Sequence, residues 1–468
     1  MRPRTSRCAP SRSASELAAA DQGAALPCSP PSDADPVRND ELDAFFAPLS
    51  AFAVLILAVS GGADSVAMMH LVRRWLRLRA RPPMQVVVAT VDHGLRAGSR
   101  AEAEWVIGQA QALGFDTALL AWSGDKPATG LQDAAREARY RLLAELAAGF
   151  RSHGMVGVVT AHTEDDQAET LLMRLARGSG LDGLAAMATS RPLGDDRQMK
   201  LLRPLLAVSG ARLRATLRAA NATWIEDPSN DAERFERVRL RKARALLAGL
   251  GLSNDKIALS ARRLARVRAA LEAALGDLQR KARLDLHGGA FASFDRAAWL
   301  AAPEELRLRL LARLIASYGG QSEPLRLAQL EALVERVAQA GFEGATLAGA
   351  IVMSHGDDIR VWREAGREAL PTLTLPPGAS GVWDRRFRVG AAPDSPGPIE
   401  VRALGAQAFA RLRQDFDTLR DLPAGAAATL PAFWHQEELI VVPRLAGLPG
   451  APADWEAQRR LYSAEFLG

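Results

Sequence analysis

Residues 53–78 read AVLILAVSGGADSVAMMHLVRRWLRL, and this stretch decides the fold. The apolar run from Ala53 to Val59 has the length of a buried strand, and from Val66 to Leu78 apolar residues recur at helical spacing. Between them, Gly61 and Gly62 allow a tight turn and a close approach of the backbone to a ligand. A strand that passes through such a turn directly into a helix is typical of an anion-binding α/β unit. A plain strand-to-helix turn with a Ser/Asp cap is the alternative, but it explains only the two glycines.

The same alternation continues along the chain as far as residue 176. It predicts further strands at residues 86–91, 117–122 and 155–161, and further helices at 101–113, 131–148 and 165–176. Strands joined in this way by right-handed crossovers form an open parallel sheet that binds ligands at the carboxyl ends of its strands. The predicted fold class is therefore α/β.

The remainder of the chain has a different pattern. Beyond residue 205 it predicts basic helices, and from about residue 344 it shows short β-like runs separated by Gly and Pro. A chain of 468 residues exceeds what one core usually supports. We therefore expect a disordered N-terminal extension, a catalytic domain, a helical domain and a small C-terminal α+β domain, at residues 1–45, 46–250, 251–343 and 344–468. The Arg/Ser-rich, acid-poor extension can mimic an organelle transit peptide, although Ala/Pro-rich disorder explains it equally well.

Cysteine usage and charge narrow the classes of function. The only two cysteines, Cys8 and Cys28, lie in the first thirty residues, so the expected folded region has no disulfide, cysteine-ligated metal, iron–sulfur cluster or thiol nucleophile. No apolar run is long enough for a membrane span. Residues 191–285 contain 21 Lys/Arg against 11 Asp/Glu. A field of that sign attracts nucleic acid, whereas solvated helix faces are the alternative explanation.

The residues of the glycine turn predict which groups bind the phosphates of a nucleotide and which of its bonds is not the one that breaks. The hydroxyls of Ser60 and Ser65, with the first N–H groups of the helix, can bind phosphate oxygens. The loop lacks the Gly-Lys-Ser/Thr ending of loops that support γ-phosphate transfer, so a different bond of the nucleotide is expected to break. Asp64 brings a negative charge to an anion site, which implies a bridging Mg²⁺ ion.

Polar residues follow two other predicted strands at the same edge of the sheet. Asp92 and His93 end the second strand, although a turn capped by Asp and Gly would look similar. After the fourth strand come His162 and, at helical spacing on one face, Asp166, Glu169 and Thr170. Acids at the start of a helix are often only caps and partners of the helix dipole. Four polar groups converging beside a nucleotide loop favour chemistry instead.

Arg136 and Arg139 lie three residues apart on the helix that leads into the fourth strand. An arginine near the α-phosphate would stabilise the charge that develops there, whereas a solvent-facing arginine is the alternative for each taken singly.

Taken together, these segments resemble a known family. Ser-Gly-Gly-x-Asp-Ser after a strand is similar to the PP-loop of N-type ATP pyrophosphatases, which split ATP between its α and β phosphates. The whole set resembles the tRNA(Ile)-lysidine synthetase family over residues 51–247, in order and spacing, and more weakly beyond. The matching segments are Ser60–Ser65, Val91–Arg96, Ala135–Tyr140, Ala161–Thr170, Arg177–Gly180, Arg203–Leu206 and Glu226–Asn230.

The resemblance implies a cytosolic enzyme that uses ATP and Mg²⁺ to join L-lysine to C2 of the wobble cytidine (position 34) of the CAU-anticodon isoleucine tRNA. An adenylated cytidine is the implied intermediate, and AMP and pyrophosphate are the products. The C-terminal domain would recognise the acceptor stem and body of the tRNA. No membrane partner is expected, and a dimer is the favoured oligomer. The ATP-binding residues would be Ser60, Gly61, Gly62, Ala63, Asp64, Ser65, Asp92, His93, Ala161, Arg177 and Gly178.

The expected catalytic residues are Asp64, Arg139, His162, Asp166 and Glu169. Asp64 and Asp166 are candidates for metal binding or proton removal, and Asp64 is the expected Mg²⁺ ligand. Glu169 would orient the substrate, and Arg139 and His162 would contact phosphate or nucleotide.

One departure concerns the family's Arg-Asn-x-x-Arg run, for which this chain has Arg237-Val238-Arg239-Leu240-Arg241 without the asparagine. The roles of Arg237 and Arg241 therefore remain open.

Two other functions compete with this one. Other PP-loop enzymes that modify tRNA also adenylate bases, but those that deliver sulfur need cysteines, which the predicted folded region lacks. A catalytically silent RNA-binding protein on a PP-loop scaffold would not need the full set of polar residues. The complete set favours an enzyme.

Overall fold

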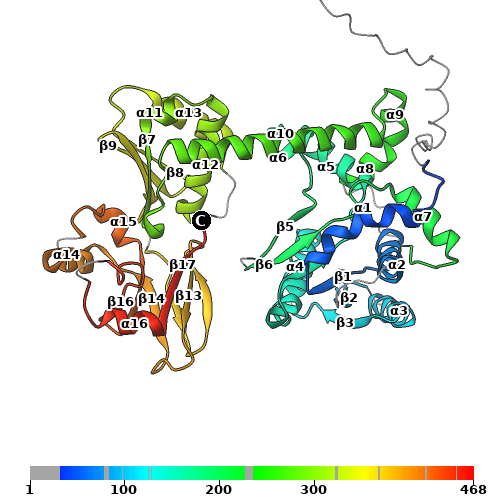
Figure 1. The fold of residues 1–468 in the computed structure, drawn as a ribbon, viewed down its shortest axis with the longest axis horizontal. Helices are drawn as coiled ribbons and strands as arrows, with labels where there is room; N and C mark the ends of the chain where they lie inside the picture. Colours follow the sequence, from blue (N-terminus) through cyan, green and yellow to red (C-terminus); the bar gives the residue numbers. More distant parts are fainter. Residues whose placement is uncertain are drawn as a thin grey trace, which may run out of the picture. The chain divides into compact units, whose positions relative to one another are not determined.

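The computed structural model (Figure 1) describes most of the chain after residue 31. The described residues are 32–78, 84–96, 98–124, 126–127, 129–194, 196–226, 236–321, 325–366, 369–416, 419–448 and 451–468. They divide into two compact units, Met1–Arg262 and Arg263–Gly468. None of the helices in the described part is long and apolar enough to cross a membrane.

The first unit is built on a six-stranded sheet with the order β3-β2-β1-β4-β6-β5. Its strands are β1 (Val54–Ala58), β2 (Gln85–Asp92), β3 (Asp116–Ala121), β4 (Val156–Val159), β5 (Ser190–Leu193) and β6 (Asp196–Leu202). All neighbouring pairs are parallel except β5 with β6, so β5 is an antiparallel edge strand. The α/β prediction and its four parallel strands are confirmed. The sequence pattern did not predict β5 and β6.

The order of the strands places β1 at the point where the chain reverses direction across the sheet. The chain runs outward from β1 to β2 and β3, then returns to place β4 on the other side of β1. Val54 accordingly pairs with Gln85 of β2 and with Val156 of β4. A crevice outside the carboxyl ends of two such strands is where open α/β sheets bind ligands. The segments after β1 and β4 are therefore brought together.

Alternate residues of β1 pack into two cores, one on each face of the sheet. Leu55 and Leu57 join the core beneath α2 (Ala63–Leu78) and α7 (Gly210–Ala219). Val54 and Ile56 join the opposite core with residues of α4 (Leu131–Ala148). Two-sided burial explains the uninterrupted apolar run of this strand. The other helices of the unit are α3 (Ser99–Ala112), α5 (Glu164–Ala176), α6 (Leu181–Leu184), α8 (Glu236–Lys242) and α9 (Arg244–Gly249).

The ordered structure begins before residue 46, where we expected it to begin. Residues 39–51 form the short helices η1 (Asn39–Glu41), α1 (Leu42–Phe46) and η2 (Ala47–Ala51), and Val37, Leu42 and Phe46 are buried in the core beside α2. These few apolar residues gain buried partners from α2 and α7, which the local sequence pattern before residue 46 does not reveal. Residues 1–31 of the expected extension lie outside the described residues.

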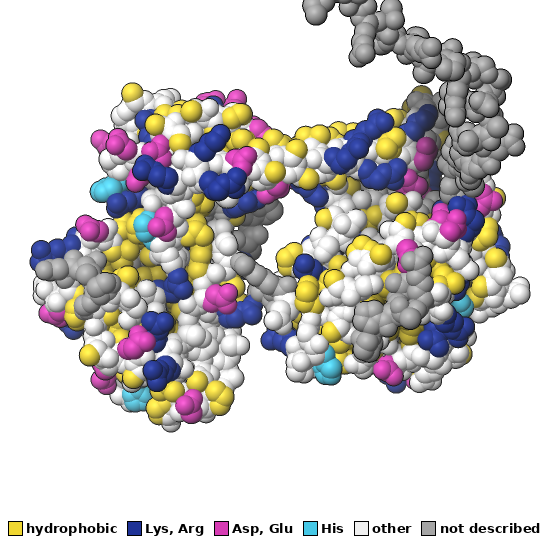
Figure 2. Space-filling model, viewed as in Figure 1, with side chains coloured by type: hydrophobic (Ala, Val, Ile, Leu, Met, Phe, Trp, Pro, Cys, Tyr) yellow, Lys and Arg dark blue, Asp and Glu magenta, His cyan; other side chains and the backbone are white. Residues whose placement is uncertain are grey.

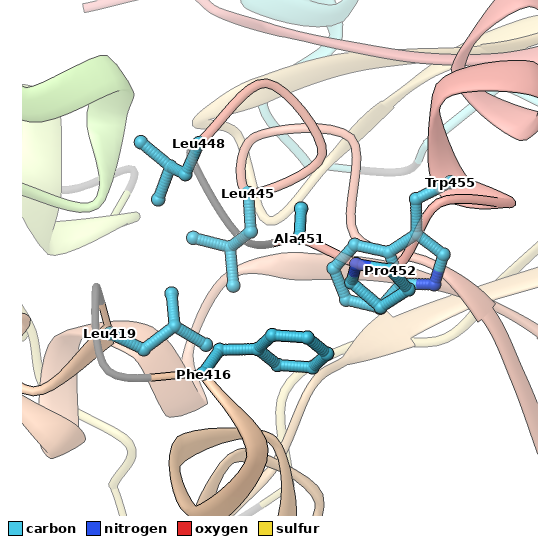
Figure 3. A pocket seen from close by; sticks show the side chains of 7 residues that line it. All are labelled: Phe416, Leu419, Leu445, Leu448, Ala451, Pro452 and Trp455. Carbon is cyan, nitrogen blue, oxygen red and sulfur yellow. The ribbon is translucent and has the colours of Figure 1, made fainter.

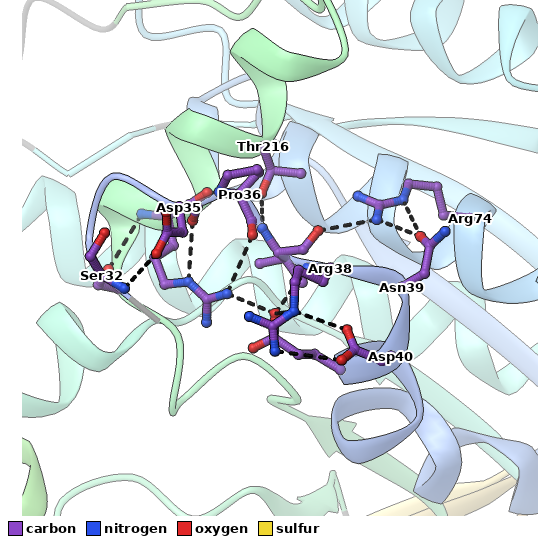
Figure 4. A network of polar contacts seen from close by, with 12 residues as sticks. Ser32, Asp35, Pro36, Arg38, Asn39, Asp40, Arg74 and Thr216 are labelled. Atoms are coloured by element: carbon purple, nitrogen blue, oxygen red, sulfur yellow. Dashed lines mark hydrogen bonds and ion pairs between the residues drawn. The ribbon is translucent and has the colours of Figure 1, made fainter. Parts of the chain in front are cut away.

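A polar network fastens this N-terminal segment to α7 (Figure 4). The Arg212 guanidinium donates to the carbonyls of Asp35 and Pro36 and pairs with Glu41 at 2.8 Å. The Val37 N–H donates to the Thr216 hydroxyl at 2.9 Å. We call residues 32–46 the N-terminal strap.

Helix α10 (Asn254–Lys281) begins in the first unit and continues into the second. The second unit contains a sheet of order β7-β10-β9-β8, made of β7 (Phe291–Asp295), β8 (Gly344–Leu347), β9 (Ala350–His355) and β10 (Asp358–Arg363). Its helices α11 (Arg296–Leu300), α12 (Glu304–Gly319) and α13 (Leu327–Ala338) share one core with this sheet. The expected boundary at residues 343/344 thus falls inside a single core, because β7 comes before these helices in the chain and pairs with β10 after them.

Two further sheets complete the second unit. One has the order β11-β14-β15-β16, from β11 (Leu373–Leu375), β14 (Ile399–Ala403), β15 (Pro431–His435) and β16 (Glu438–Val441). The other is β12-β13-β17, from β12 (Ser380–Trp383), β13 (Phe387–Ala391) and β17 (Tyr462–Phe466), and the helices are α14 (Ala406–Asp415), α15 (Ala424–Ala428) and α16 (Trp455–Leu461). A small pocket in this part is lined only by apolar residues, among them Phe416 and Trp455 (Figure 3).

Close packing around β4 leads to a prediction about Gly157. A β-carbon at this position would lie 2.7 Å from Leu202 Cδ1 and 3.0 Å from Leu55 Cδ2. We expect Gly157→Ala to lower the free energy of unfolding by about 1–3 kcal/mol, as overpacked cores do. Gly108→Ala in α3, where a β-carbon meets nothing within 4 Å, is the matched control and should stabilise by up to about 1 kcal/mol. Urea unfolding of both variants would measure this, and equal effects would contradict the packing argument.

Candidate active site

The glycine turn after β1 has a defined local structure. Gly61 has a φ of +89°, a conformation that favours glycine, and a β-carbon there would lie 2.8 Å from Ile225 Cδ1. The Ser65 hydroxyl donates to the Gly62 carbonyl at 2.9 Å and accepts from the Ser60 N–H at 3.2 Å. Two serine hydroxyls and the first N–H groups of α2 thus face the same turn, as the sequence predicted.

Asp64 lies in the first turn of α2, and its Oδ1 atom is buried without a hydrogen-bond partner in the described structure. Burial raises the pKa of its carboxyl to about 6, with a further contribution from the charge of Asp166, whereas the charge of Arg214 opposes the rise. Mutual repulsion with Asp166 means that the two carboxylates lie near each other. A cation or a proton would relieve the unfavourable charge at Asp64.

Asp166 lies in the first turn of α5 and has a capping role as well as a place in the site. Its Oδ2 accepts from the Thr163 N–H at 2.9 Å, while Thr163 caps the Asp166 N–H in return, which is a capping box. Its Oδ1 lies 4.0 Å from Nη1 of Arg237. One carboxylate oxygen of Asp166, Oδ2, therefore serves as a helix cap. The other, Oδ1, faces the guanidinium of Arg237.

Glu169 is 3% exposed, the deepest of the acids on α5. Arg241 Nε donates to its Oε1 at 2.7 Å, and Arg244 Nη2 lies 3.2 Å from the same oxygen. Arg244 also pairs with Asp165 at 3.3 Å. The sequence singled out neither Arg244 nor Asp165. The sequence does contain a signal for both residues. The acidic helix start at residues 164–169 is complementary in charge to the basic run at residues 237–244, so the two segments can form ion pairs.

His162 and Arg139 lie close enough for the arginine's charge to act on the histidine. His162 Nδ1 is 2.9 Å from the Thr160 hydroxyl, and burial lowers the pKa of its imidazole to about 4, so this ring is neutral at pH 7. The charge of Arg139 acts on both His162 and His93, which places its guanidinium within reach of the two rings. Arg139 Nε is buried without a hydrogen-bond partner in the described structure, whereas Arg136 is exposed. An unsatisfied buried donor of this kind is suited to an anionic ligand.

Asp92 is the last residue of β2, the neighbour of β1, and His93 follows it. Both contacts of Asp92 Oδ1, from the Gly94 N–H at 2.8 Å and the Ser99 hydroxyl at 2.7 Å, remain within its own turn. These two bonds lower the pKa of Asp92, that from Ser99 contributing most. His93 packs edge-on against Trp122, and its Nδ1 is buried without a partner among the described residues. The structure thus favours a turn-capping role for Asp92 and leaves His93 open to a ligand.

Arg177 and Gly178 were expected beside the nucleotide, but they lie at the carboxyl end of α5. At 1.5 Å per residue this is roughly 16 Å along the helix from Asp166. Arg177 pairs there with Glu236 at 2.6 Å. Among the expected ATP-binding residues, the structure does not bring these two to the phosphate loop. Ala161 lies two residues after the end of β4, the neighbour of β1.

Two of the expectations from the sequence concern residues 226–241. Residues 227–230 of the expected Glu226–Asn230 match lie outside the described residues. Val238 occupies the family's asparagine position and is buried, at 6% exposure, on α8. Arg237 and Arg241 flank it, and both point toward acids of α5.

The arrangement can bind a polyphosphate and hold a cation at its edge. The glycine turn supplies N–H and hydroxyl donors, Asp64 supplies an unsatisfied carboxylate oxygen, and Arg139 supplies an unsatisfied cationic donor. Such donors act strongly when they are fixed in advance and shielded from water.

Comparisons with known proteins identify the family that this chain resembles. A family model described as a PP-loop domain matches residues 35–246. A tRNA(Ile)-lysidine synthase from Bradyrhizobium sp. (strain BTAi1) is 44% identical over 345 residues, covering 70% of this chain and 94% of that protein. The enzyme of the same name from Ruegeria pomeroyi is 39% identical over 425 residues, covering 88% and 93% respectively. Among solved structures, the U34-tRNA thiolase NcsA from Methanococcus maripaludis aligns with a TM-score of 0.41 at 13% identity, covering 48% of this chain and 78% of that one.

The pKa of Asp64 leads to a prediction about stability and pH. The folded protein binds the Asp64 proton more tightly than the unfolded chain, so ionisation of this group destabilises the fold progressively from about pH 4 to pH 6. In the absence of nucleotide we expect Asp64→Asn to raise the free energy of unfolding by about 1–3 kcal/mol at pH 7.5, and to have no effect near pH 4. Urea unfolding at the two pH values checks this. A destabilised variant at pH 7.5 would show that the carboxylate is already satisfied.

The contacts of Glu169 lead to a second prediction. Arg241→Gln leaves this buried carboxylate with Arg244 alone, so we expect a loss of about 1–2 kcal/mol in the free energy of unfolding. Arg177→Gln, which breaks an ion pair of a 64% exposed arginine, is the matched control and should change it by less than about 0.5 kcal/mol. Thermal unfolding of both variants at low salt makes the comparison, and equal losses would argue against a special role for the buried pair.

Proposed function

The chain belongs to the tRNA(Ile)-lysidine synthase family, and on this basis we propose that it joins L-lysine to C2 of the wobble cytidine of the CAU-anticodon isoleucine tRNA. One observation carries the proposal. The PP-loop and the charged start of α5 meet at one edge of the sheet, where Asp64 has a carboxylate oxygen without a hydrogen-bond partner among the described residues. This arrangement occurs in a chain that covers 94% of a known tRNA(Ile)-lysidine synthase. The resulting enzyme is a ligase that forms a carbon–nitrogen bond.

The first step is adenylation of the cytidine. The C2 oxygen attacks the α-phosphorus of ATP, the bond from that phosphorus to the oxygen bridging the β-phosphate breaks, and pyrophosphate leaves. The glycine turn and the start of α2 would hold the outgoing phosphates. Arg139, whose Nε lacks a partner among the described residues, would stabilise the negative charge that develops on the α-phosphate.

The residues present fit a Mg²⁺ ion at the edge of the phosphate site. Asp64 Oδ1 is a buried oxygen without a partner, and neighbouring carboxylates increase its need for a cation. Among the described residues no three His, Cys, Asp or Glu side chains are placed so that they could hold one metal ion, so phosphate oxygens and water would complete the coordination. When bound, the ion would neutralise charge on the pyrophosphate.

The second step joins lysine to the activated base. The ε-amine attacks C2, the bond from C2 to the adenylated oxygen breaks, and AMP leaves with that oxygen. A free lysine amine has a pKa of about 10.4, so a proton must first be removed. Asp166 has one oxygen outside its capping box and is the residue we assign to proton removal. Glu169, fixed by Arg241 and Arg244, would orient the substrate.

The tRNA would bind through basic helices. Figure 2 shows Lys and Arg side chains gathered along α10, which contains Arg262, Arg263, Arg266 and Arg268. Phosphate contacts of this kind give affinity that falls steeply with salt, while unstacked anticodon-loop bases supply sequence information. We place the enzyme in the cytoplasm, and a dimer remains the favoured oligomer.

Two alternatives are less well supported. A sulfur-transferring PP-loop enzyme needs cysteines, and both cysteines of this chain lie within residues 1–31. A silent RNA-binding protein would have no use for a buried, unsatisfied Asp64 beside an anion-binding turn. Release of pyrophosphate that depends on tRNA excludes the silent protein.

The proposed function leads to a kinetic prediction. Purified protein should release pyrophosphate from ATP only when isoleucine tRNA is present, AMP formation should require both the tRNA and lysine, and nucleoside mass spectrometry should detect lysidine. Arg139→Gln should lower kcat for AMP formation by about 100-fold, since it removes a donor to the reacting phosphate. Arg141→Gln, an exposed position on the same helix, is the control and should stay within about twofold.

The proposal fails if the wild-type protein forms AMP equally well without tRNA, or if nucleoside analysis finds no lysidine after full turnover. Wild-type rates in Arg139→Gln would remove the role of that residue only.

A further inference from the structure

Three charged groups converge over Gly210, the first residue of α7. A β-carbon at Gly210 would lie 3.0 Å from Asp165 Oδ2, 3.3 Å from Asp64 Oδ1 and 3.3 Å from Arg214 Nη1. Asp64 Oδ1 and Arg214 Nη1 are therefore no more than twice 3.3 Å apart, yet they form no ion pair within 4.0 Å in the described structure. The absence of a side chain at Gly210 leaves the space in which these groups meet.

Arg214 differs from the other arginines around the site. Arg237, Arg241, Arg244 and Arg262 each face a carboxylate of α5. Arg214 makes no ion pair and no side-chain hydrogen bond with any part of the chain that the structure describes. Its charge nevertheless acts on Asp64 more strongly than that of Arg241, which also faces the site. An arginine held near a phosphate loop without a carboxylate partner has all its donors available for an anion.

The orientation of Arg214 is fixed by the opposite face of α7. Arg212 and Thr216 on that face bind the N-terminal strap through the contacts of Figure 4. The N-cap Ser209 accepts from the Arg212 N–H, and the Gly210 N–H donates to Asp165 at 3.1 Å. Helix α7 therefore cannot rotate without breaking several bonds, and Arg214, one turn after Gly210, stays directed toward Asp64.

We propose that Arg214 is a further phosphate-binding residue of this site, that it contacts the β- and γ-phosphates of ATP and the released pyrophosphate, and that Gly210 is required because a side chain there would occupy the path of the guanidinium. The inference rests on the proposed use of ATP. It adds a cation from α7, a helix that the sequence had not connected with the nucleotide.

Binding measurements on the full chain test the proposal without turnover. We expect Arg214→Gln to weaken binding of ATP and of inorganic pyrophosphate by about tenfold, the loss typical of one charge-assisted hydrogen bond. Binding of AMP, which lacks the β- and γ-phosphates, should stay within twofold of the wild type. Arg214→Lys should recover part of the affinity, and Arg218→Gln, one turn further on an exposed position of α7, should match the wild type. Isothermal titration with ATP, pyrophosphate and AMP gives all the values.

The remaining outcomes decide against the proposal. Equal weakening of AMP and pyrophosphate binding would show that Arg214 acts on the α-phosphate or on the fold, and unchanged pyrophosphate binding would show that it acts on no phosphate.

Gly210→Ala adds an independent test. It should weaken pyrophosphate binding while leaving Tm unchanged or raised, since alanine is the better helix former. Absence of lysidine from wild-type reactions would count against the proposed function, and the titrations would still show whether Arg214 binds phosphate.

Discussion

Electrostatic repulsion among carboxylates is the constraint on which the rest of this site depends. Asp64, Asp165, Asp166 and Glu169 are crowded at the ends of two neighbouring strands, and Glu169 is buried. Such a cluster is tolerated only if cations are supplied nearby. Arginines from α8, α9 and α10 supply them, and each reaches back to the first turns of α5. The basic segment after residue 236 therefore balances the charge of the acids on α5.

Much of the fold could be predicted because it depends on local pattern. The apolar run of β1 and the glycine turn specify a strand, a phosphate loop and a helix within about 25 residues, and the alternation after it specifies the parallel sheet. Strand β7 and the N-terminal strap could not be found in this way. Each contains only a few apolar residues, and their partners lie outside the local pattern. Strand β7 pairs with β10, more than 60 residues later, and the strap packs against α2 and α7.

Prediction of the candidate site residues also relied on local sequence pattern and was limited in the same way. Residues next to strand ends, such as Asp64, His162 and Asp166, were identified because the carboxyl edge of a parallel sheet gathers them. Arg244 and Arg214 come from helices that begin after the last parallel strand, so no sequence spacing relates them to the loop. Arg177 follows the start of α5 in sequence but lies at the carboxyl end of that helix, so its expected place beside the nucleotide stays a prediction.

The antiparallel edge strand β5 has a consequence for the behaviour of the protein in concentrated solution. A parallel sheet with an open edge invites another chain to add a strand, and this addition is a common route to aggregation. Strand β5 is four residues long and carries Pro192, which has no N–H to offer an incoming strand. The sheet that holds the glycine turn is thereby protected at this edge against pairing with strands of other molecules.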